Sequence, residues 1–314
     1  QAQAASIATI LGQGVRGTAA DGALASQALI NNPYGVIEDA AGTGLYFADN
    51  STHRVLSLNY RTNTISVIAG TGAAGYSGDE GPARLAQLAQ PHEVRFDSKG
   101  DLYVVERDNH VVRRIDMKSG IISVFAGTPA SAGFSGDGGP ALQAQFNQPH
   151  GIALDADDNL YVCDVLNNRV RRIDAGSGLI TTFAGNGEAG QTPDTGLLTA
   201  TPLEGPRSLE CSKSGRIYLA LREGNSVFEL DLVSGQMQRI AGNGENGYSG
   251  DGGPALAATF GSAGPGGLTG PKGLCVSEDG SSIFIADCEN HVIRKVDLGS
   301  GIITTVAGTG MAGD

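Results

Sequence analysis

Five positions of the chain combine a repeated sequence context with a changing side chain. Each directly follows a proline that opens a similar segment, and the five are Tyr34, His92, His150, Arg207 and Lys272. All five side chains form hydrogen bonds, and the two imidazoles also bind metals and transfer protons. Because the surrounding segments repeat while this position varies, we expect these residues to form the binding site.

The two histidines raise the question of a metal centre. His92 and His150 occur in the similar strings QPHEV and QPHGI. A catalytic zinc ordinarily takes three protein ligands and one water molecule. The equivalent positions hold Tyr34, Arg207 and Lys272 instead, and the two cationic side chains would repel a metal ion. We therefore predict no cofactor and no catalytic residue, with zinc at His92 and His150 as the alternative.

A nine-residue phrase recurs along the chain. GYSGDEGPA begins at residue 75, GFSGDGGPA at 133 and GYSGDGGPA at 247, and two divergent copies begin at 17 and 190. The fifth position is always an aspartate: Asp21, Asp79, Asp137, Asp194 and Asp251. One carboxylate per copy is far fewer than the 6–8 oxygen ligands of calcium. We therefore interpret the phrase as a structural linker, with calcium binding as the alternative.

Each repeat also contains four short apolar segments separated by turns. In the third repeat these are residues 150–155, 160–164, 169–174 and 179–185, and residues 140–146 before them favour a short helix. Four such strands form an antiparallel meander, and radial repetition of meanders gives a β-propeller. The sequence predicts a single all-β domain over residues 1–314, with units opening at Pro33, Pro91, Pro149, Pro206 and Pro271.

The third strands carry the features of a known repeat. DNHVVRRID (108–116), LNNRVRRID (166–174) and ENHVIRKVD (289–297) resemble the NHL repeat, and the linkers are similar to those of bacterial NHL proteins and of teneurins. The resemblance implies a β-propeller, mostly six-bladed, that serves as a recognition platform. It also implies the alternative of a channel-centred, metal-dependent lyase or hydrolase using His92 and His150, because the peptide-amidating lyase holds zinc with histidines in a similar context.

Several polar residues of the repeat fit structural roles. His53, His110 and His291 occupy equivalent places before the third strand, so we expect them to support turns and blade packing. The pairs Arg113–Arg114, Arg171–Arg172 and Arg294–Lys295 recur with an acidic residue one strand away, at Asp49, Glu106, Asp164 and Asp287. These are interpreted as ion pairs between strands.

The N-terminal segment predicts an additional strand. Residues 8–14 (ATILGQG) match an outermost strand and its glycine turn, so the chain contains six outermost strands but five of each inner strand. Five blades closing alone, continuation of the chain into a sixth blade, or completion by another copy would each accommodate this strand. If the chain is complete, the ring has an open seam where the inner strands of a sixth blade are missing. We then expect self-association through this seam, with the N-terminal strand contributing, because an unpaired strand edge favours association.

Composition limits the function. A net charge of −12 disfavours nucleic-acid binding, and no apolar run is long enough to span a membrane. The N-terminal glutamine resembles a mature end, and the four cysteines predict at most one disulfide. We predict an exported, extracellular or periplasmic, non-enzymatic NHL propeller. Its role would be binding, adhesion or self-assembly, with a protein or glycan partner.

Overall fold

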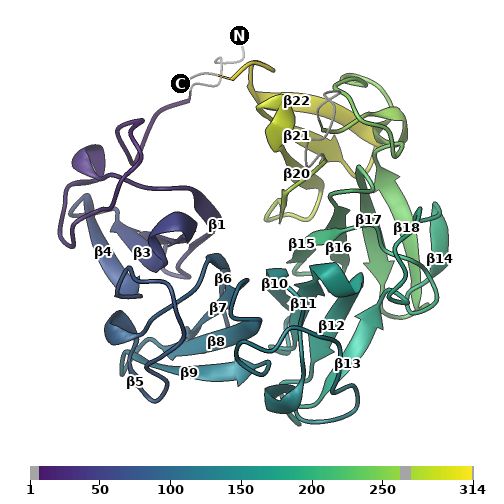
Figure 1. Ribbon diagram of the computed structural model, residues 1–314. Helices are drawn as coiled ribbons and strands as arrows, with labels where there is room; N and C mark the ends of the chain where they lie inside the picture. The colour runs from purple at the N-terminus through teal and green to yellow at the C-terminus, as the bar shows by residue number, and fades with distance from the viewer. Residues whose placement is uncertain (1–6, 262–269, 313–314) are drawn as a thin grey trace.

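The computed structural model, which describes residues 7–261 and 270–312, is an all-β propeller of five radial blades (Figure 1). The first three blades consist of β1 (Pro33–Glu38), β2 (Gly44–Asp49), β3 (Arg54–Asn59) and β4 (Thr64–Ala69); β6 (Pro91–Phe96), β7 (Leu102–Glu106), β8 (Val111–Asp116) and β9 (Ile121–Ala126); and β10 (Pro149–Leu154), β11 (Leu160–Asp164), β12 (Arg169–Ile173) and β13 (Ile180–Ala184). The last two consist of β15 (Pro206–Cys211), β16 (Ile217–Leu221), β17 (Ser226–Asp231) and β18 (Gln236–Ala241); and β19 (Gly273–Val276), β20 (Ser282–Asp287), β21 (Val292–Asp297) and β22 (Ile302–Gly308). The predicted fold class is therefore confirmed.

Within every blade the strands run antiparallel in sequence order, so the first strand lies innermost (Figure 1). The innermost strands contact one another in the order β1, β6, β10, β15, β19. The sheets β1–β4 and β19–β22 flank the remaining side of the ring, where the first and last described residues lie (Figure 1). Four units open at the predicted proline, whereas β19 begins at Gly273, two residues after Pro271.

Helical structure is limited to short 3₁₀ turns. The described residues contain η1 (Ala25–Gln27), η2 (Asn50–Thr52), η3 (Ala83–Leu85), η4 (Ala141–Gln143), η5 (Val165–Asn167), η6 (Ala255–Ala257) and η7 (Cys288–Asn290). The helix predicted over residues 140–146 is thus a single turn, η4, because the backbone of Ala144 returns to an extended conformation. No helix among the described residues has the length and apolar character needed to cross a bilayer.

The repeated linker runs along the outer edge of the blade that follows it. Two linkers add a short strand to that edge, β5 (Gly81–Pro82) on β9 and β14 (Thr195–Leu197) on β18. The other linkers form single bridges at the equivalent place, such as Pro140 with Leu179. This pairing satisfies backbone groups that an outermost strand would otherwise expose. The linker is therefore structural, as its composition predicts.

The linker aspartate has a partner that the sequence interpretation does not include. Asp137 lies 2.7 Å from Nη2 of Arg171, whose side chain is fully buried. The same guanidinium lies 3.5 Å from the buried carboxylate of Asp164 and donates to the carbonyl oxygens of Ser135 and Gln145. Arg113 and Arg294 have equivalent partners in their own blades. Each of these arginines therefore joins its linker to two strands of its blade.

Two blades lack this buried cation. In the first blade Leu56 occupies the position of Arg171, and in the fourth blade Phe228 does so. The fourth blade also replaces the acidic partner with Leu221, and both apolar side chains are fully buried. The same fold thus accommodates either an ion pair or a hydrophobic pair, consistent with the small net stabilisation of buried ion pairs.

The strand predicted at residues 8–14 is not formed, which corrects that part of the sequence interpretation. Residues 7–10 are largely exposed coil, and the segment is held by one backbone hydrogen bond from Gly12 to Ala25 and by packing of Leu11 on the first blade. An outermost strand pairs with the third strand of its own blade. Among the described residues every third strand already pairs with its own fourth strand, so no ladder is left for this segment.

The four cysteines are free thiols, consistent with the prediction of at most one disulfide. Cys163 is buried between the third and fourth blades, and burial raises the pKa of its thiol. Cys275 and Cys288 share the fifth blade but are unpaired and exposed. The glycine-rich segment at residues 261–270 lies mostly outside the described residues.

Candidate functional site

A β-bulge begins the innermost strand of four blades. The register with the second strand shifts between Tyr34 and Val36, and at equivalent places in β6, β10 and β15. The residue after the proline lies at or beside this irregularity. In β6 this residue is His92, and in β15 it is Arg207. A bulge reorients side chains and is common beside binding sites. The β-bulge thus falls at the residue after the blade-opening proline, which is the position that the sequence identifies as the candidate site.

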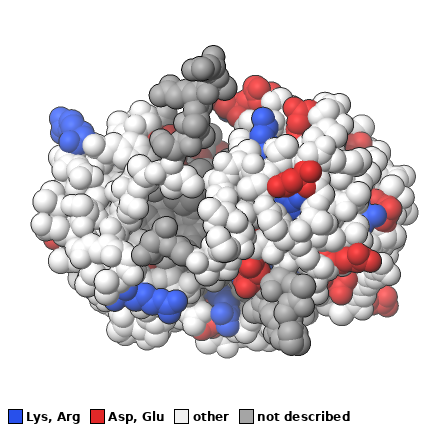
Figure 2. Space-filling model, turned by 90° about the horizontal axis from the view of Figure 1, so that it is seen from above, with Lys and Arg blue, Asp and Glu red and all other residues white. Residues whose placement is uncertain are grey.

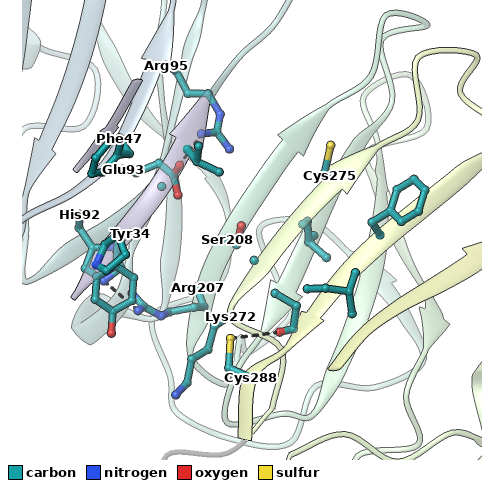
Figure 3. A pocket seen from close by; sticks show the side chains of 18 of the residues that line it. Tyr34, Phe47, His92, Glu93, Arg95, Arg207, Ser208, Lys272, Cys275 and Cys288 are labelled. Atoms are coloured by element: carbon teal, nitrogen blue, oxygen red, sulfur yellow. Dashed lines mark hydrogen bonds and ion pairs between the residues drawn. The ribbon is translucent and has the colours of Figure 1, made fainter. Parts of the chain in front are cut away.

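Four of the five predicted residues meet at the centre of the ring, and Figure 3 shows Tyr34, His92 and Arg207 among them. The ring of His92 lies 4.2 Å from that of Tyr34 and 4.5 Å from that of His150, measured between centroids. Nη2 of Arg207 lies 2.8 Å from Nε2 of His92, and the guanidinium lies 5.7 Å from the centre of the Tyr34 ring. We name Tyr34, His92, His150 and Arg207 the central cluster. It draws one residue from each of the first four blades.

The fifth predicted residue contributes differently. Lys272 lines the same cavity, but its side chain leads away from the central cluster (Figure 3). Its ammonium group forms an ion pair with Glu289 of the fifth blade. Lys272 therefore lies on the rim of the cavity rather than among the stacked rings.

Both histidines of the central cluster are held neutral. Burial, together with the charge of Arg207, lowers the pKa of His150 to about 2 and lowers that of His92 well below its ordinary value. Nδ1 of His150 lies 2.8 Å from the carbonyl oxygen of Gln148 and therefore carries the proton. Because Arg207 donates to Nε2 of His92, the proton of His92 is on Nδ1. That Nδ1 has no partner among the described residues.

The neutral state of His150 gives stability a pH dependence. The unfolded chain protonates this imidazole below about pH 6.5, whereas the folded chain does not until about pH 2. The unfolded state therefore binds more protons in this range, and the stabilisation present above pH 6.5 is lost as pH falls. Between pH 7.5 and 5.0 we expect the wild type to lose about 2 kcal/mol of unfolding free energy relative to His150→Gln, measured by urea denaturation. Val233→Ala, which changes no titratable group at an exposed turn, is the control and should lose the same unfolding free energy as the wild type over this pH range.

A second polar group beside the central cluster has no counterpart in the sequence interpretation. Glu93 and Arg95 of β6 form a buried ion pair, and Nη2 of Arg95 lies 3.4 Å from Glu210 of β15. Burial raises the pKa of Glu93 and of Glu210. These residues stand two and four positions after a blade-opening proline, so comparison of the unit openings at those positions could have identified them.

The central cluster borders a cavity of about 640 Å³ between the first and fifth blades. Its polar wall includes Tyr34, His92, Glu93, Arg95, Arg207 and Lys272. Its other walls are mainly apolar and include Leu11, Val36, Phe47, Leu274, Phe284 and Ile293. A cavity of this size with a few convergent polar groups is typical of small-molecule sites.

The central cluster does not match a zinc site. No group of three or more His, Cys, Asp or Glu side chains suitable for a metal ion occurs in the part of the chain that the structure describes. Nε2 of His92 faces the guanidinium of Arg207, so a cation at that nitrogen would meet a positive charge 2.8 Å away. The donor set therefore disfavours metal binding at His92 and His150.

The three remaining histidines lie at turns outside the central cluster. His53, His110 and His291 have left-handed backbone conformations at the ends of η2, the β7–β8 turn and η7. Nδ1 of His53 accepts a hydrogen bond from the backbone of Gln90 at 3.2 Å, and Nδ1 of His110 accepts one from Gln148 at 3.1 Å. These contacts join the turns at His53 and His110 to the opening of the next blade, in agreement with the structural role predicted for these two residues.

Comparisons with known proteins agree with this architecture. Residues 146–173 match the NHL repeat. The chain is 26% identical to protein SUPPRESSOR OF QUENCHING 1, chloroplastic, of Arabidopsis thaliana, over 87% of the chain and 26% of the plant protein. It is 29% identical to teneurin-1 of Mus musculus over 84% of the chain and 10% of teneurin-1. It is 23% identical to NHL repeat-containing protein 2 of Homo sapiens over 90% of the chain and 41% of that protein.

Solved structures show the same fold at low sequence identity. An auxiliary nutrient binding protein from Bacteroides ovatus superimposes with a TM-score of 0.61 at 13% identity, over 89% of this chain and 58% of that chain. Virginiamycin B lyase from Staphylococcus aureus superimposes with a TM-score of 0.52 at 15% identity, over 88% and 70%. The chain is thus a β-propeller with a polar cluster at its centre. The NHL-repeat match and these relatives support an NHL-repeat propeller, and the chain spans less than half the length of these curated relatives.

Proposed function

We propose that this chain is a binding module whose ligand occupies the central cavity. The observation that supports this most directly is the hydrogen bond from Arg207 to His92, because it sets a cation beside a neutral imidazole at the polar end of the cavity. Such a pair recognises a polar group and lacks the basic, unhindered nitrogen that a general base requires. The favoured function is therefore recognition, and no residue is assigned a catalytic role.

Ligand-observed NMR tests this proposal with a panel of small polar and amphipathic compounds. We expect compounds that bind the wild type to be recovered unchanged, and their binding to weaken at least tenfold in Tyr34→Ala. Val233→Ala, a substitution at an exposed turn between β17 and β18, is the matched control. Consumption of a compound by the wild type but not by His92→Gln would instead establish an enzyme.

The metal-dependent lyase or hydrolase is the alternative, and zinc content distinguishes it. We expect protein purified in the presence of zinc to retain no more metal than His92→Gln does, because Arg207 competes with a cation for Nε2 of His92. His110→Gln serves as a control for loss of an imidazole elsewhere. Zinc bound at one equivalent by the wild type and His110→Gln, but lost in His92→Gln, would contradict the binding proposal.

A second candidate function, self-assembly, is favoured by the exposure of one repeated position. The apolar residue that packs against the following blade is fully buried in the first four blades, at Val55, Val112, Val170 and Val227. Its equivalent in the fifth blade, Ile293, is 38% exposed. On the other side of the opening, Val36 of the first blade is 57% exposed, whereas its equivalent Val94 is fully buried.

The face around Ile293 and the face around Val36 correspond to the two surfaces that meet wherever neighbouring blades pack. Blade packing elsewhere in the ring joins the face around Val55 and Ala69 to the face around Val94 and Leu102. The face around Ile293 therefore fits the Val36 face of a second copy, and we propose head-to-tail association of copies at this seam. Seen from above, the β1–β4 side is mostly uncharged with a few basic side chains, whereas acidic side chains gather on the β19–β22 side (Figure 2).

The remaining expectations stay predictions. A protein or glycan partner, and an extracellular or periplasmic location, are expected from the sequence alone. One relative is named as chloroplastic, so relatives of this kind are not confined to one compartment.

A further inference from the structure

Arg207 differs from the other cations around the central cavity in having no acidic partner. Lys272 pairs with Glu289, Arg95 with Glu93, and Arg222 with Glu223. Within residues 7–261 and 270–312, Arg207 forms no ion pair, although only 4% of its surface is exposed. A buried charge without a counter-ion is costly and is ordinarily retained only where something balances it.

The unused hydrogen-bonding atoms of this pair are all donors. Nε and Nη1 of Arg207 have no acceptor among the described residues, and neither has Nδ1 of His92. Nη2 of Arg207 is bonded to a neutral ring, which does not offset its charge. Burial and the nearby Arg222 lower the pKa of Arg207 to about 10, which leaves it charged at neutral pH. An acceptor with negative charge would satisfy both the donors and the cation.

The charged side chains around Arg207 determine how much negative charge a ligand can carry at this site. Glu93 and Glu210 lie close by and form ion pairs with Arg95, and Glu93 also attracts Arg207 over a longer distance. A dianion such as sulfate would therefore meet a cation whose charge is already partly balanced, in an acidic neighbourhood. A carboxylate carries a single charge, and its two oxygens match the planar fork of a guanidinium.

We propose that Arg207, with His92 and Tyr34 beside it, binds a small monocarboxylate at the inner end of the central cavity. This inference rests on the proposed binding function and specifies its ligand class. Arg207 supplies the charge, His92 fixes the guanidinium through Nε2, and the Tyr34 ring bounds the site 5.7 Å from the guanidinium carbon. The apolar walls of the cavity leave room for a short alkyl chain beyond the carboxylate.

The test uses ¹³C-carboxyl propionate as the probe, titrated into the whole chain and followed by NMR. We expect saturable binding that weakens at least tenfold in Arg207→Met. Arg172→Met is the matched control, because Arg172 pairs with Asp174 in the third blade and does not line the cavity; its affinity should change less than twofold. Propionamide, the neutral analogue, should not bind at the same concentrations, and sulfate should not compete.

Three outcomes would overturn the inference. Equal affinity in Arg207→Met and the wild type would exclude Arg207 as the anchor, and tighter binding of sulfate would exclude a monoanion site. Binding of propionamide with the affinity of propionate would remove the role of charge yet leave the proposed binding function intact. If Arg207→Met does not fold, a nuclear Overhauser contact between bound propionate and the ring of His92 in the wild type decides, and its absence at saturation rejects the site.

Discussion

The Arg171→Ala variant is expected to lose about 3–5 kcal/mol of unfolding free energy. The substitution leaves the buried carboxylate of Asp164 without its cation and the carbonyl oxygens of Ser135 and Gln145 without a donor. It also detaches the linker at Asp137 from its blade. Chemical denaturation at neutral pH measures the loss.

The neighbouring residue provides a matched control for this prediction. Arg172 belongs to the same strand, but its side chain is 30% exposed and pairs with Asp174 at the surface. Arg172→Ala should cost less than about 1 kcal/mol. The double substitution Arg171→Phe with Asp164→Leu reproduces the pair found at Phe228 and Leu221, and it should recover most of the lost stability. Similar costs for Arg171→Ala and Arg172→Ala would show that the buried network is not what stabilises the blade.

At the seam, Ile293→Asp is expected to weaken self-association of the chain by at least about 30-fold. The substitution places a charge at the centre of the proposed contact with the Val36 face of a second copy. Because Ile293 is already 38% exposed, the folded chain should tolerate the change, in contrast to Val170→Asp at the buried equivalent position. Light scattering across a concentration series measures the association.

Val233→Asp is the control for this experiment, since it adds the same charge at a fully exposed turn away from the seam. It should associate like the wild type. A wild-type chain that stays monomeric at the highest attainable concentration would reject self-assembly. Loss of folding in Ile293→Asp would instead show that the fifth blade depends on this face within a single copy.

The blade architecture could be predicted because the repeat specifies it locally. Turn residues, alternating strands and the linker recur in register. The assignment of four strands to one repeat therefore applies to all five repeats. The prediction of a strand at residues 8–14 was wrong. The sequence of this segment matches an outermost strand, but such a strand needs an unpaired third strand as its neighbour, and the described residues contain none. A similar limit applies to residues 140–146, where the alanines permit a helix and the chain needs only the single turn η4 before returning to the next blade.

The position of the candidate site was also accessible from the sequence, whereas its chemistry was not. Repetition identifies the residue after each blade-opening proline, and the structure places Tyr34, His92, His150 and Arg207 together. Which of these carries a charge depends on burial and on contacts between different blades. The ion pair between Lys272 and Glu289, and the unused hydrogen-bond donors of Arg207 among the described residues, arise only when the ring assembles.

The linker aspartates bear on the order in which the molecule folds. Asp137 and Arg171, like Asp79 and Arg113, are separated by 34 residues, and the aspartate always comes first in the chain. Each pair therefore closes a loop within one repeat, at a low cost in chain entropy compared with contacts across the whole ring. During synthesis the acceptor of each repeat is present before its arginine emerges. We therefore expect the propeller to form blade by blade from the N-terminus, each finished blade providing the surface on which the next one condenses.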